Sequence, residues 1–346
     1  MFLILNAHCL YIMDVIAEIR KKAAAAQRTI VLPEGALDDR MVQATLDVAR
    51  NKLAKLILLG DEATILAKAK TFGANPDTFR IINPEKSDKL QEFVKIYMDM
   101  RAQKGKPVSA QEALDSLKNP LYYGAMLVKL GEAHGSLAGA FNTTGAVITA
   151  AARIIGTKPG IKNASSFFIM VLKDKTFGQD GVLIYADCAL IPNPDAETMA
   201  DIAITTAHSA RQLVGIDPKI AMLSFSTKGS SKDPLVDKVQ QATELVKQRA
   251  PELQVDGEMQ ADAALIASVG AKKSPGSPVA GKANVLIFPD LNSGNISYKL
   301  TERLAGAKAI GPIMQGFAKP ANDLSRGCSP EDIANMIAVT SVLSLS

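Results

Sequence analysis

The sequence has few of the residues on which many enzyme sites are built. Its 346 residues include three cysteines, three histidines and no tryptophan. Cys9, Cys188 and Cys328 are odd in number and show no CxxC spacing, so neither a disulfide framework nor a zinc cluster is predicted. A reducing cytoplasm is the expected compartment. The histidines are scattered, and neither HExxH nor GxGxxG occurs, which disfavours a metal site, a Ser-His triad and a Rossmann cofactor site.

Strong charge of one sign and long apolar runs are also missing. The net charge is only +4, without a run of five basic residues, so nucleic-acid binding is disfavoured. The opening MFLILNAHCLYI is apolar, but its twelve residues are too few to span a bilayer and lack the basic start of a signal peptide. The pattern that begins at Met13 predicts a separate amphipathic helix. We interpret residues 1–12 as an upstream-start or cloning extension, or otherwise as a short surface element.

Aliphatic segments that alternate with amphipathic helices fill the rest of the chain. Hydrophobic residues make up 47% of the sequence and aromatic residues only 5%, as in proteins whose small helices cover aliphatic strands. Strand-like runs include TIVLPE (29–34), AKLILLG (54–60) and NVLIFPD (284–290), with helical patterns between most of them. This alternation predicts an α/β fold with mostly parallel sheets.

The length predicts two α/β lobes with a cleft between them. We assign residues 1–157 and 316–346 to the first lobe and residues 158–315 to the second. SSFFIMVLKD and GVLIYADCAL are joined by a short connection with Gly178 and Gly181, which predicts an antiparallel hairpin inside an otherwise parallel sheet.

Polar loops follow several of the strands. PEGALDDR (33–40), FSTKGSSKDP (225–234) and FPDLNSGN (288–295) each come directly after a strand, where open α/β sheets bind ligands. Ordinary helix capping explains the same residues equally well. GSPVAGKA (276–283) resembles a phosphate loop, but Ala283 replaces the required hydroxyl and a strand follows it, so an NTPase is disfavoured.

The stretch NDLSRGCSPEDI (322–333) combines hydroxyls, a thiol, an arginine and acids. Ser329, Pro330 and Asp332 form the pattern of a helix start, with serine at the N-cap and an acid three residues later. Asp332 therefore has a structural explanation. It could also act as a base beside Ser325 and Arg326, and spacing alone leaves both possibilities open.

These last blocks carry a resemblance to a known family. GPIMQGFAKPANDLSRGCSPEDI, ADAALIASVGAKKSPGSPVAGKANVLIFPDLNSGNISYKL, AMLSFSTKGSSK and YADCALIPNPDAE resemble phosphate acetyltransferases, within the phosphate acetyl/butyryltransferase family. The resemblance runs from about Met13 to the end. It implies reversible transfer of an acetyl group between acetyl phosphate and coenzyme A, with release of inorganic phosphate. It also implies a homodimer with the two-lobed fold of isocitrate and isopropylmalate dehydrogenases, without a bound cofactor or metal.

The resemblance also implies roles for individual residues. Asp332 corresponds to the base that takes the thiol proton of coenzyme A, while Ser325 and Arg326 act at the reacting centre. Arg101 matches an arginine that holds the phosphate. Arg40 matches one that contacts the phosphate groups of coenzyme A. The loop with Ser226, Lys228 and Gly229 is assigned to coenzyme A as well.

One block departs from the family pattern. Members commonly read HSTADTVRPALQII where this chain reads NTTGAVITAAARII (142–155). Thr149 thus replaces an arginine that clamps the acyl phosphate, and Asn142 replaces a histidine. Arg153 lies one helical turn beyond Thr149, and we predict that it partly substitutes.

Three alternatives remain. A longer-chain phosphate acyltransferase, with propionyl or butyryl preference, is the nearest. A non-catalytic protein that binds coenzyme A or an acyl phosphate is a second, made conceivable by Thr149. A decarboxylating dehydrogenase of the same fold is a third, but the sequence lacks the converging aspartates and the lysine–tyrosine pair that such enzymes require.

Overall fold

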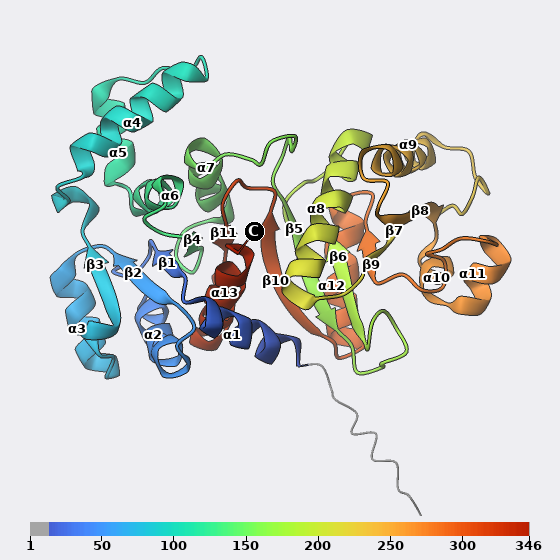
Figure 1. Ribbon diagram of the computed structural model, residues 1–346, viewed down its shortest axis with the longest axis horizontal. Coiled ribbons are helices and arrows are strands. Elements are labelled where there is room, and N and C mark those ends of the chain that lie inside the picture. Colours follow the sequence, from blue (N-terminus) through green and yellow to red (C-terminus); the bar gives the residue numbers. More distant parts are fainter. Residues whose placement is uncertain (1–13, 346) are drawn as a thin grey trace, which may run out of the picture.

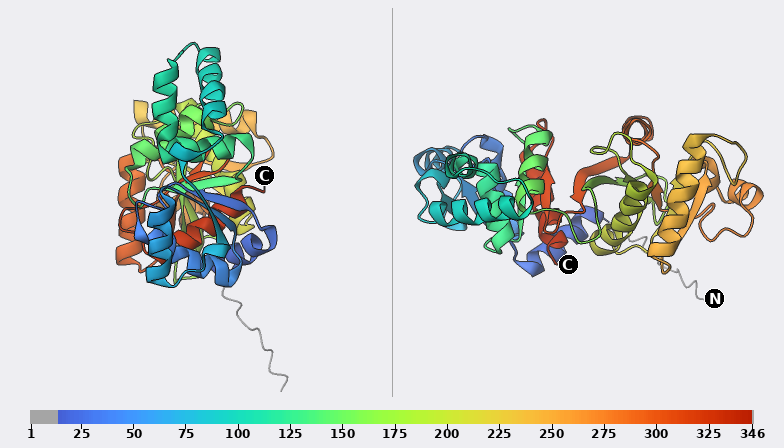
Figure 2. Two further views of the ribbon diagram at one scale, coloured as in Figure 1. Left: turned by 90° about the vertical axis from the view of Figure 1, so that its left-hand side faces the viewer. Right: turned by 90° about the horizontal axis from the view of Figure 1, so that it is seen from above.

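Two α/β lobes lie side by side along the long axis of the molecule (Figures 1 and 2). The computed structural model describes residues 14–345, so the interpretation of residues 1–12 as an extension lies outside them. The first lobe holds a five-stranded sheet in the order β11–β4–β1–β2–β3, and every adjacent pair in it is parallel. Its strands are β1 (Thr29–Leu32), β2 (Lys55–Leu59), β3 (Phe79–Ile82), β4 (Gly135–Ala138) and β11 (Ala321–Asp323).

The second lobe holds a six-stranded sheet in the order β10–β5–β6–β9–β7–β8. Four of its strands, from β6 to β8, run parallel, whereas β5 pairs antiparallel with both β6 and β10. The predicted antiparallel hairpin is thus confirmed. The strands are β5 (Ser165–Val171), β6 (Val182–Ala186), β7 (Lys219–Leu223), β8 (Gln254–Met259), β9 (Val285–Ile287) and β10 (Lys308–Gln315).

Helices cover the faces of both sheets. Many begin where an aspartate side chain accepts a hydrogen bond from the first helical turn, which satisfies N–H groups that the helix leaves unpaired; these N-caps are Asp14, Asp38, Asp61, Asp195, Asp233 and Asp290. Helices of the first lobe are α1 (Val15–Ala26), α2 (Asp39–Asn51), α3 (Glu62–Phe72), α4 (Leu90–Gln103), α5 (Ala110–Lys118), α6 (Pro120–Leu130), α7 (Thr144–Ile154) and α13 (Pro330–Leu343). The second lobe has α8 (Ala196–Val214), α9 (Pro234–Arg249), α10 (Ala261–Leu265), α11 (Ala267–Lys273) and α12 (Leu291–Leu304).

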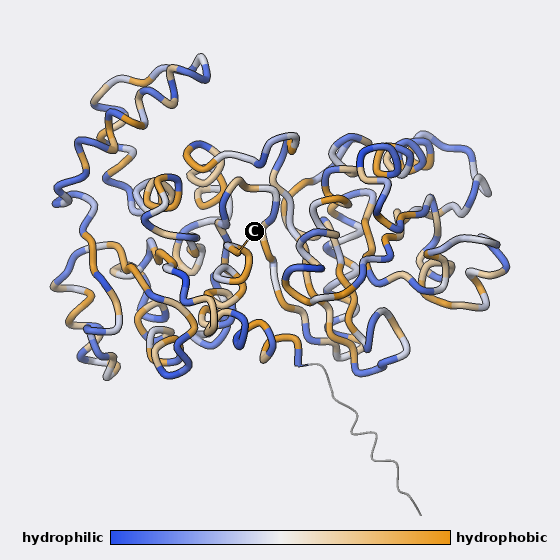
Figure 3. Tube along the Cα trace, viewed as in Figure 1, coloured by the Kyte–Doolittle hydropathy of each residue, from blue (hydrophilic) through white to orange (hydrophobic). Residues whose placement is uncertain are grey.

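The last helix returns to the first lobe and joins it to the second. Helix α13 packs against α1, α2 and α8, and its apolar side chains belong to a core that continues from one lobe into the other. Figure 3 shows the apolar residues gathered on the strands and on α13. Two linkers, 155–164 and 316–320, also connect the lobes, and they bond to each other where the Lys158 N–H donates to the Gly316 carbonyl at 2.9 Å.

The predicted fold class, two lobes with mostly parallel sheets, is confirmed. The boundaries at 157/158 and 315/316 stay a prediction. Within residues 14–345, no helix is both long enough and apolar enough to cross a membrane.

Candidate functional site

Three loops of the first lobe meet at one edge of its sheet. Strands β11, β4 and β1 are adjacent and parallel, so the loops that follow them, 324–329, 139–143 and 33–38, emerge side by side. The chain runs from β1 outward through β2 and β3 and then returns to the other side of β1 with β4 and β11. Such a reversal of strand order is where open α/β sheets bind ligands.

Glu34 holds the β1 loop to the β4 loop. Its side chain is completely buried, and its carboxylate accepts the backbone N–H groups of Gly139, Ala140, Phe141 and Asn142 at 2.8–3.3 Å. The side-chain amide of Asn142 donates to it as well, at 2.8 Å. A buried carboxylate is tolerated only when donors replace its water shell, and Glu34 has five. The conformation of the 139–142 backbone therefore depends on Glu34.

Arg40 connects all three loops. Its guanidinium forms a bidentate pair with Asp38, which lowers the pKa of that carboxyl. It also donates to the carbonyls of Arg326, Cys328 and Ala140 at 2.7–2.9 Å. These bonds use all five N–H donors that a guanidinium has. Arg40 thus fixes the backbone around Arg326 and, in this arrangement, has no donor left for a ligand.

Asp323 ends β11 beneath these loops. Its side chain is 2% exposed; Oδ2 accepts the hydroxyl of Thr144 at 2.6 Å, whereas Oδ1 is buried without a partner. Burial raises the pKa of Asp323 to about 6, although the bond from Thr144 opposes the shift. Gly139 packs against it with a φ of +110°, and a side chain there would collide with Oδ1. Glycine is therefore required at position 139.

The predicted capping box at the start of α13 is confirmed. The Ser329 hydroxyl accepts the N–H of Asp332 at 3.1 Å, and Oδ2 of Asp332 accepts the Ser329 N–H at 2.9 Å and its hydroxyl at 2.8 Å. Pro330 occupies the first helical position. Within the described part of the chain, Oδ1 of Asp332 accepts no hydrogen bond, and the residue is exposed. The cap thus fixes one carboxylate oxygen and leaves the other open to solvent.

Ser325 and Arg326 occupy the exposed turn between β11 and α13. The Ser325 hydroxyl accepts the N–H of Gly327 at 3.2 Å. No side-chain bond of Arg326 occurs among residues 14–345, while its carbonyl is held by Arg40. Ser325, Arg326 and Asp332 therefore lie on one exposed stretch, with the guanidinium of Arg326 unpaired within the described residues.

The other predicted phosphate ligands are spread over two helices. Thr149 and Arg153 are exposed on α7, one turn apart, and Arg153 donates to the hydroxyl of Tyr122 at 3.2 Å. Arg101 lies in the last turn of α4, within the α4–α5 hairpin that projects from the lobe (Figure 1). Among the described residues, no hydrogen bond or ion pair joins Arg101 to the three loops. Asn142 is held by Glu34.

The predicted coenzyme A loop follows β7 in the second lobe. Glu258, at the end of the neighbouring strand β8, accepts the Ser226 hydroxyl at 2.9 Å and the Gly229 N–H at 2.7 Å. Burial opposes these bonds, but together with a bond from Gln240 they lower the pKa of Glu258. Lys228 forms an ion pair with the buried carboxylate of Asp256. The loop is therefore rigidly attached to the end of β8.

Of the cysteines, the structure describes Cys188 and Cys328. Cys188 and Cys328 are free and buried, and burial raises the pKa of Cys328 to about 11, which keeps its thiol protonated. Within residues 14–345 no group of three or more metal-ligating side chains occurs.

Sequence reasoning missed the acids beneath the loops. Glu34, Asp323 and Glu258 each sit where a strand ends, and that position is the signal that could have identified them. A second finding was also unexpected: a cavity of about 890 Å³ includes none of the predicted site residues.

Comparison with known proteins identifies the family. The phosphate acetyl/butaryl transferase family matches residues 14–341. A phosphate acetyltransferase from Clostridium acetobutylicum is 47% identical over 95% of this chain and 98% of its own length. One from Bacillus subtilis is 40% identical over 96% and 99%, respectively.

Solved structures agree with these relatives. A phosphotransacetylase from Streptococcus pyogenes has a TM-score of 0.90 and 40% identity, covering 96% of this chain and 98% of its own. A branched-chain phosphotransacylase from Enterococcus faecalis, at 18% identity and a TM-score of 0.64, shares the fold. The chain therefore belongs to the phosphate acetyl/butaryl transferase family and is a transferase.

Proposed function

We propose that the protein transfers an acetyl group between acetyl phosphate and coenzyme A by direct attack of the thiolate in a ternary complex. The observation that carries this proposal is the stretch from Ser325 to Asp332, where a free guanidinium and an open carboxylate oxygen lie on one turn. That turn is anchored by Arg40, so the groups are positioned before the substrates bind.

Asp332 acts as the base in this scheme. A free thiol of pKa about 8.5 is only a few per cent ionised at neutral pH, and the thiolate is the attacking species. The carboxylate takes the thiol proton, and sulfur attacks the carbonyl carbon of acetyl phosphate. The bond between that carbon and the bridging oxygen then breaks, and phosphate leaves. Such proton removal accelerates reactions by about 10²- to 10⁴-fold.

Arg326 stabilises the charge that develops. The carbonyl oxygen becomes negative in the tetrahedral state, and a fixed cation near it lowers the barrier. Ser325 supplies a hydrogen bond at the same centre. Ser325 itself is not a nucleophile in this scheme, because no histidine contacts its hydroxyl among the described residues.

Arg40 acts as a positioning residue. The resemblance assigns it to the phosphate groups of coenzyme A, but its five donors are engaged with Asp38 and three carbonyls. Contact with coenzyme A would require at least one of these bonds to break on binding. We therefore place its main contribution in the shape of the turn that presents Arg326.

We propose that both lobes contact coenzyme A. The loop with Ser226, Lys228 and Gly229 follows a strand end of the second lobe, and the ammonium of Lys228 lies there in an ion pair with Asp256. The loops after β1, β4 and β11 do not line the cavity of about 890 Å³. We propose that approach of the lobes encloses the substrates between them.

We expect Thr149, in place of the usual arginine, to affect the affinity for phosphate or the preference for an acyl chain. Arg153 is the cation one helical turn from Thr149, and its guanidinium donates to the hydroxyl of Tyr122 at 3.2 Å. We propose that Arg153 partly replaces the missing arginine. Arg153→Ala should then raise the KM for acetyl phosphate severalfold at nearly constant KM for coenzyme A, and an unchanged KM would exclude this role.

A substrate panel tests the activity itself. Formation of the thioester from coenzyme A with acetyl, propionyl and butyryl phosphate should be fastest with acetyl phosphate. Faster turnover of butyryl phosphate would select the longer-chain alternative. Binding of coenzyme A without thioester formation from any of the three would select the non-catalytic alternative.

The protein is also proposed to act in the cytoplasm as a homodimer. Helix α12 supports the second point, because Ile296, Leu300 and Leu304 are exposed by 51–81% and recur every four residues along one face. Such an apolar stripe on a polar surface is typical of an interface between subunits.

A further inference from the structure

The cavity of about 890 Å³ lies at the edge of the first-lobe sheet opposite the candidate site. It is lined by residues that precede β4 and β11, such as His134 and Pro320, and by Leu343 at the far end of α13. The candidate site follows the same two strands and begins the same helix. At about 1.5 Å per residue, the 14 residues of α13 separate the two places by roughly 20 Å.

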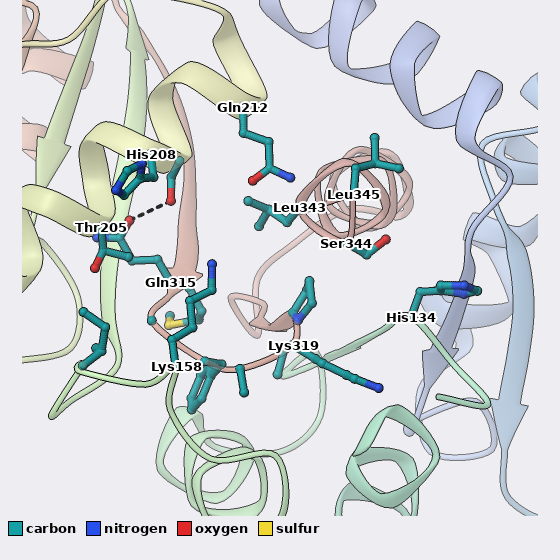
Figure 4. A pocket seen from close by; sticks show the side chains of 18 of the residues that line it. His134, Lys158, Thr205, His208, Gln212, Gln315, Lys319, Leu343, Ser344 and Leu345 are labelled. Atoms are coloured by element: carbon teal, nitrogen blue, oxygen red, sulfur yellow. Dashed lines mark hydrogen bonds between the residues drawn. The ribbon is translucent and has the colours of Figure 1, made fainter. Parts of the chain in front are cut away.

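Both interlobe linkers form part of this cavity. Lys158 and Pro159 come from the 155–164 linker, and Gly316 and Phe317 come from the 316–320 linker. Helix α8 of the second lobe supplies another wall (Figure 4). A molecule held here therefore touches both lobes and the segments that join them.

The charge of the lining is of one sign. Among residues 14–345, no aspartate or glutamate lines the cavity, whereas Lys158, Lys319 and Arg211 do, together with two histidines. Two of the cations are already engaged. Lys319 donates to the carbonyls of Val128 and Lys129, and Arg211 pairs with Asp217 at 3.5 Å.

The ammonium of Lys158 has no partner among the residues that the structure describes. Its backbone N–H is bonded to Gly316, but its ammonium makes no hydrogen bond or ion pair with the described part of the chain. Figure 4 shows its side chain extending from the linker toward α8, where His208 and Gln212 face the same space. The imidazole of His208 likewise makes no hydrogen bond among residues 14–345.

The remaining walls are apolar or uncharged. Ile161, Ile204, Phe317 and Leu345 contribute apolar surface, and the Ser209 hydroxyl donates to Gln315 at 3.1 Å. Small-molecule sites combine such apolar walls with a few polar groups and have volumes of roughly 300–1,000 Å³. The volume of about 890 Å³ falls in that range.

We propose that this cavity is an effector site for a small organic anion, a carboxylate or phosphate monoester with an apolar body. Lys158 pairs with the anionic group and His208 donates to it. The apolar body packs between the linkers and α8. Because the anion bridges both lobes, it changes their relative arrangement and hence the rate of acetyl transfer at the opposite edge.

The test uses the fluorescent anion 8-anilinonaphthalene-1-sulfonate, which carries a sulfonate on an apolar body. It is titrated into the full-length protein with saturating coenzyme A present, so that the transfer site is occupied. We expect one equivalent to bind, and Lys158→Gln to raise the Kd about tenfold. Leu345→Glu, which adds a carboxylate at an exposed part of the rim, should also weaken binding severalfold.

Lys162→Gln is the matched control, because Lys162 lies on the same linker but does not line the cavity. Its Kd should equal that of the wild type. Equal Kd values for wild type and Lys158→Gln, or equal weakening by Lys162→Gln, would overturn the site. Failure of the probe to bind would do the same.

The rate of acetyl transfer tests the effector role. The bound probe should change the wild-type rate at least twofold at saturating substrates, and the change should disappear in Lys158→Gln, whose rate without probe matches the wild type. A rate insensitive to bound probe would overturn the regulatory part of the proposal. This outcome is distinct from failure of the proposed function, which would abolish the rate without probe.

Discussion

At the scale of single residues, buried carboxylates shape the candidate site. Glu34 and Asp323 lie beneath the same loops but differ in their surroundings. Glu34 accepts five N–H donors, whereas Asp323 accepts one hydroxyl and keeps an oxygen without a partner. Hydrogen bonds therefore replace the water shell of the Glu34 carboxylate, but they replace that of Asp323 only in part.

Glu34→Gln tests the first of these carboxylates. The amide is neutral and places an NH₂ group against N–H donors, so we expect a loss of about 3 kcal/mol in the free energy of unfolding. Urea titration measures it. Glu85→Gln is the control and should change stability by less than about 0.5 kcal/mol, because Glu85 is an exposed residue of the short 3₁₀ helix Pro84–Lys86. A wild-type stability for Glu34→Gln would contradict the structural role of this carboxylate.

Asp323 predicts a pH dependence of stability. Its pKa in the folded protein is about 6, above the value of 3.8 for an unperturbed aspartate, so the folded state binds the proton more tightly. The stabilisation is therefore complete below about pH 4 and is lost as the pH rises to about 6. Asp323→Asn lacks this titration.

Urea titrations of both proteins from pH 4 to 7 isolate the effect. Relative to Asp323→Asn, the wild type should lose stability across this window, because all other groups titrate in both proteins. A constant difference between the two would show that Asp323 is not protonated near pH 6 in the folded state.

At the scale of elements, local patterns were predictable and long-range contacts were not. The α13 cap could be predicted because Ser329, Pro330 and Asp332 are neighbours in sequence. The β5–β6 hairpin could be predicted from the glycines of its connection. Strand β11 was missed because its three residues, with polar Asn322 and Asp323, carry no hydrophobic alternation. The contacts of Arg40 span up to 288 positions, and no local pattern records them.

Two capping boxes allow a matched comparison between elements. Ser329→Ala removes the cap of α13, and Ser109→Ala removes the equivalent cap of α5, in the projecting hairpin. Each should cost about 1 kcal/mol in urea titrations. Only Ser329→Ala should also lower kcat, about tenfold, because it removes one of the two hydrogen bonds that hold Oδ2 of Asp332. Equal kcat values for the two variants would show that the cap does not position Asp332.

At the scale of the whole molecule, the candidate transfer site and the proposed effector site lie at opposite edges of one sheet. The loops after β1, β4 and β11 carry the candidate chemistry, and the cavity beside the linkers lies at the opposite edge. Sequence could predict the two lobes from length and alternation. It could not predict the cavity, which arises only from how linkers, α8 and α13 pack together.

The stripe on α12 predicts how whole molecules associate. Leu300→Asp places a charge in the centre of the proposed interface, so the protein should sediment with the mass of one chain instead of two. Leu235→Asp, at a leucine exposed to a similar extent on α9, is the control and should leave the dimer intact. A monomeric wild type, or a dimeric Leu300→Asp variant, would contradict this interface.

The central claim is that Asp332 removes the thiol proton of coenzyme A. Its most direct test is the pH dependence of thioester formation from acetyl phosphate by the wild type and by Asp332→Asn, whose amide can still accept the cap from Ser329. We predict that kcat falls about 10²- to 10⁴-fold at neutral pH and is partly restored as the pH approaches the thiol pKa of about 8.5. An Asp332→Asn variant with wild-type kcat at neutral pH would contradict the account.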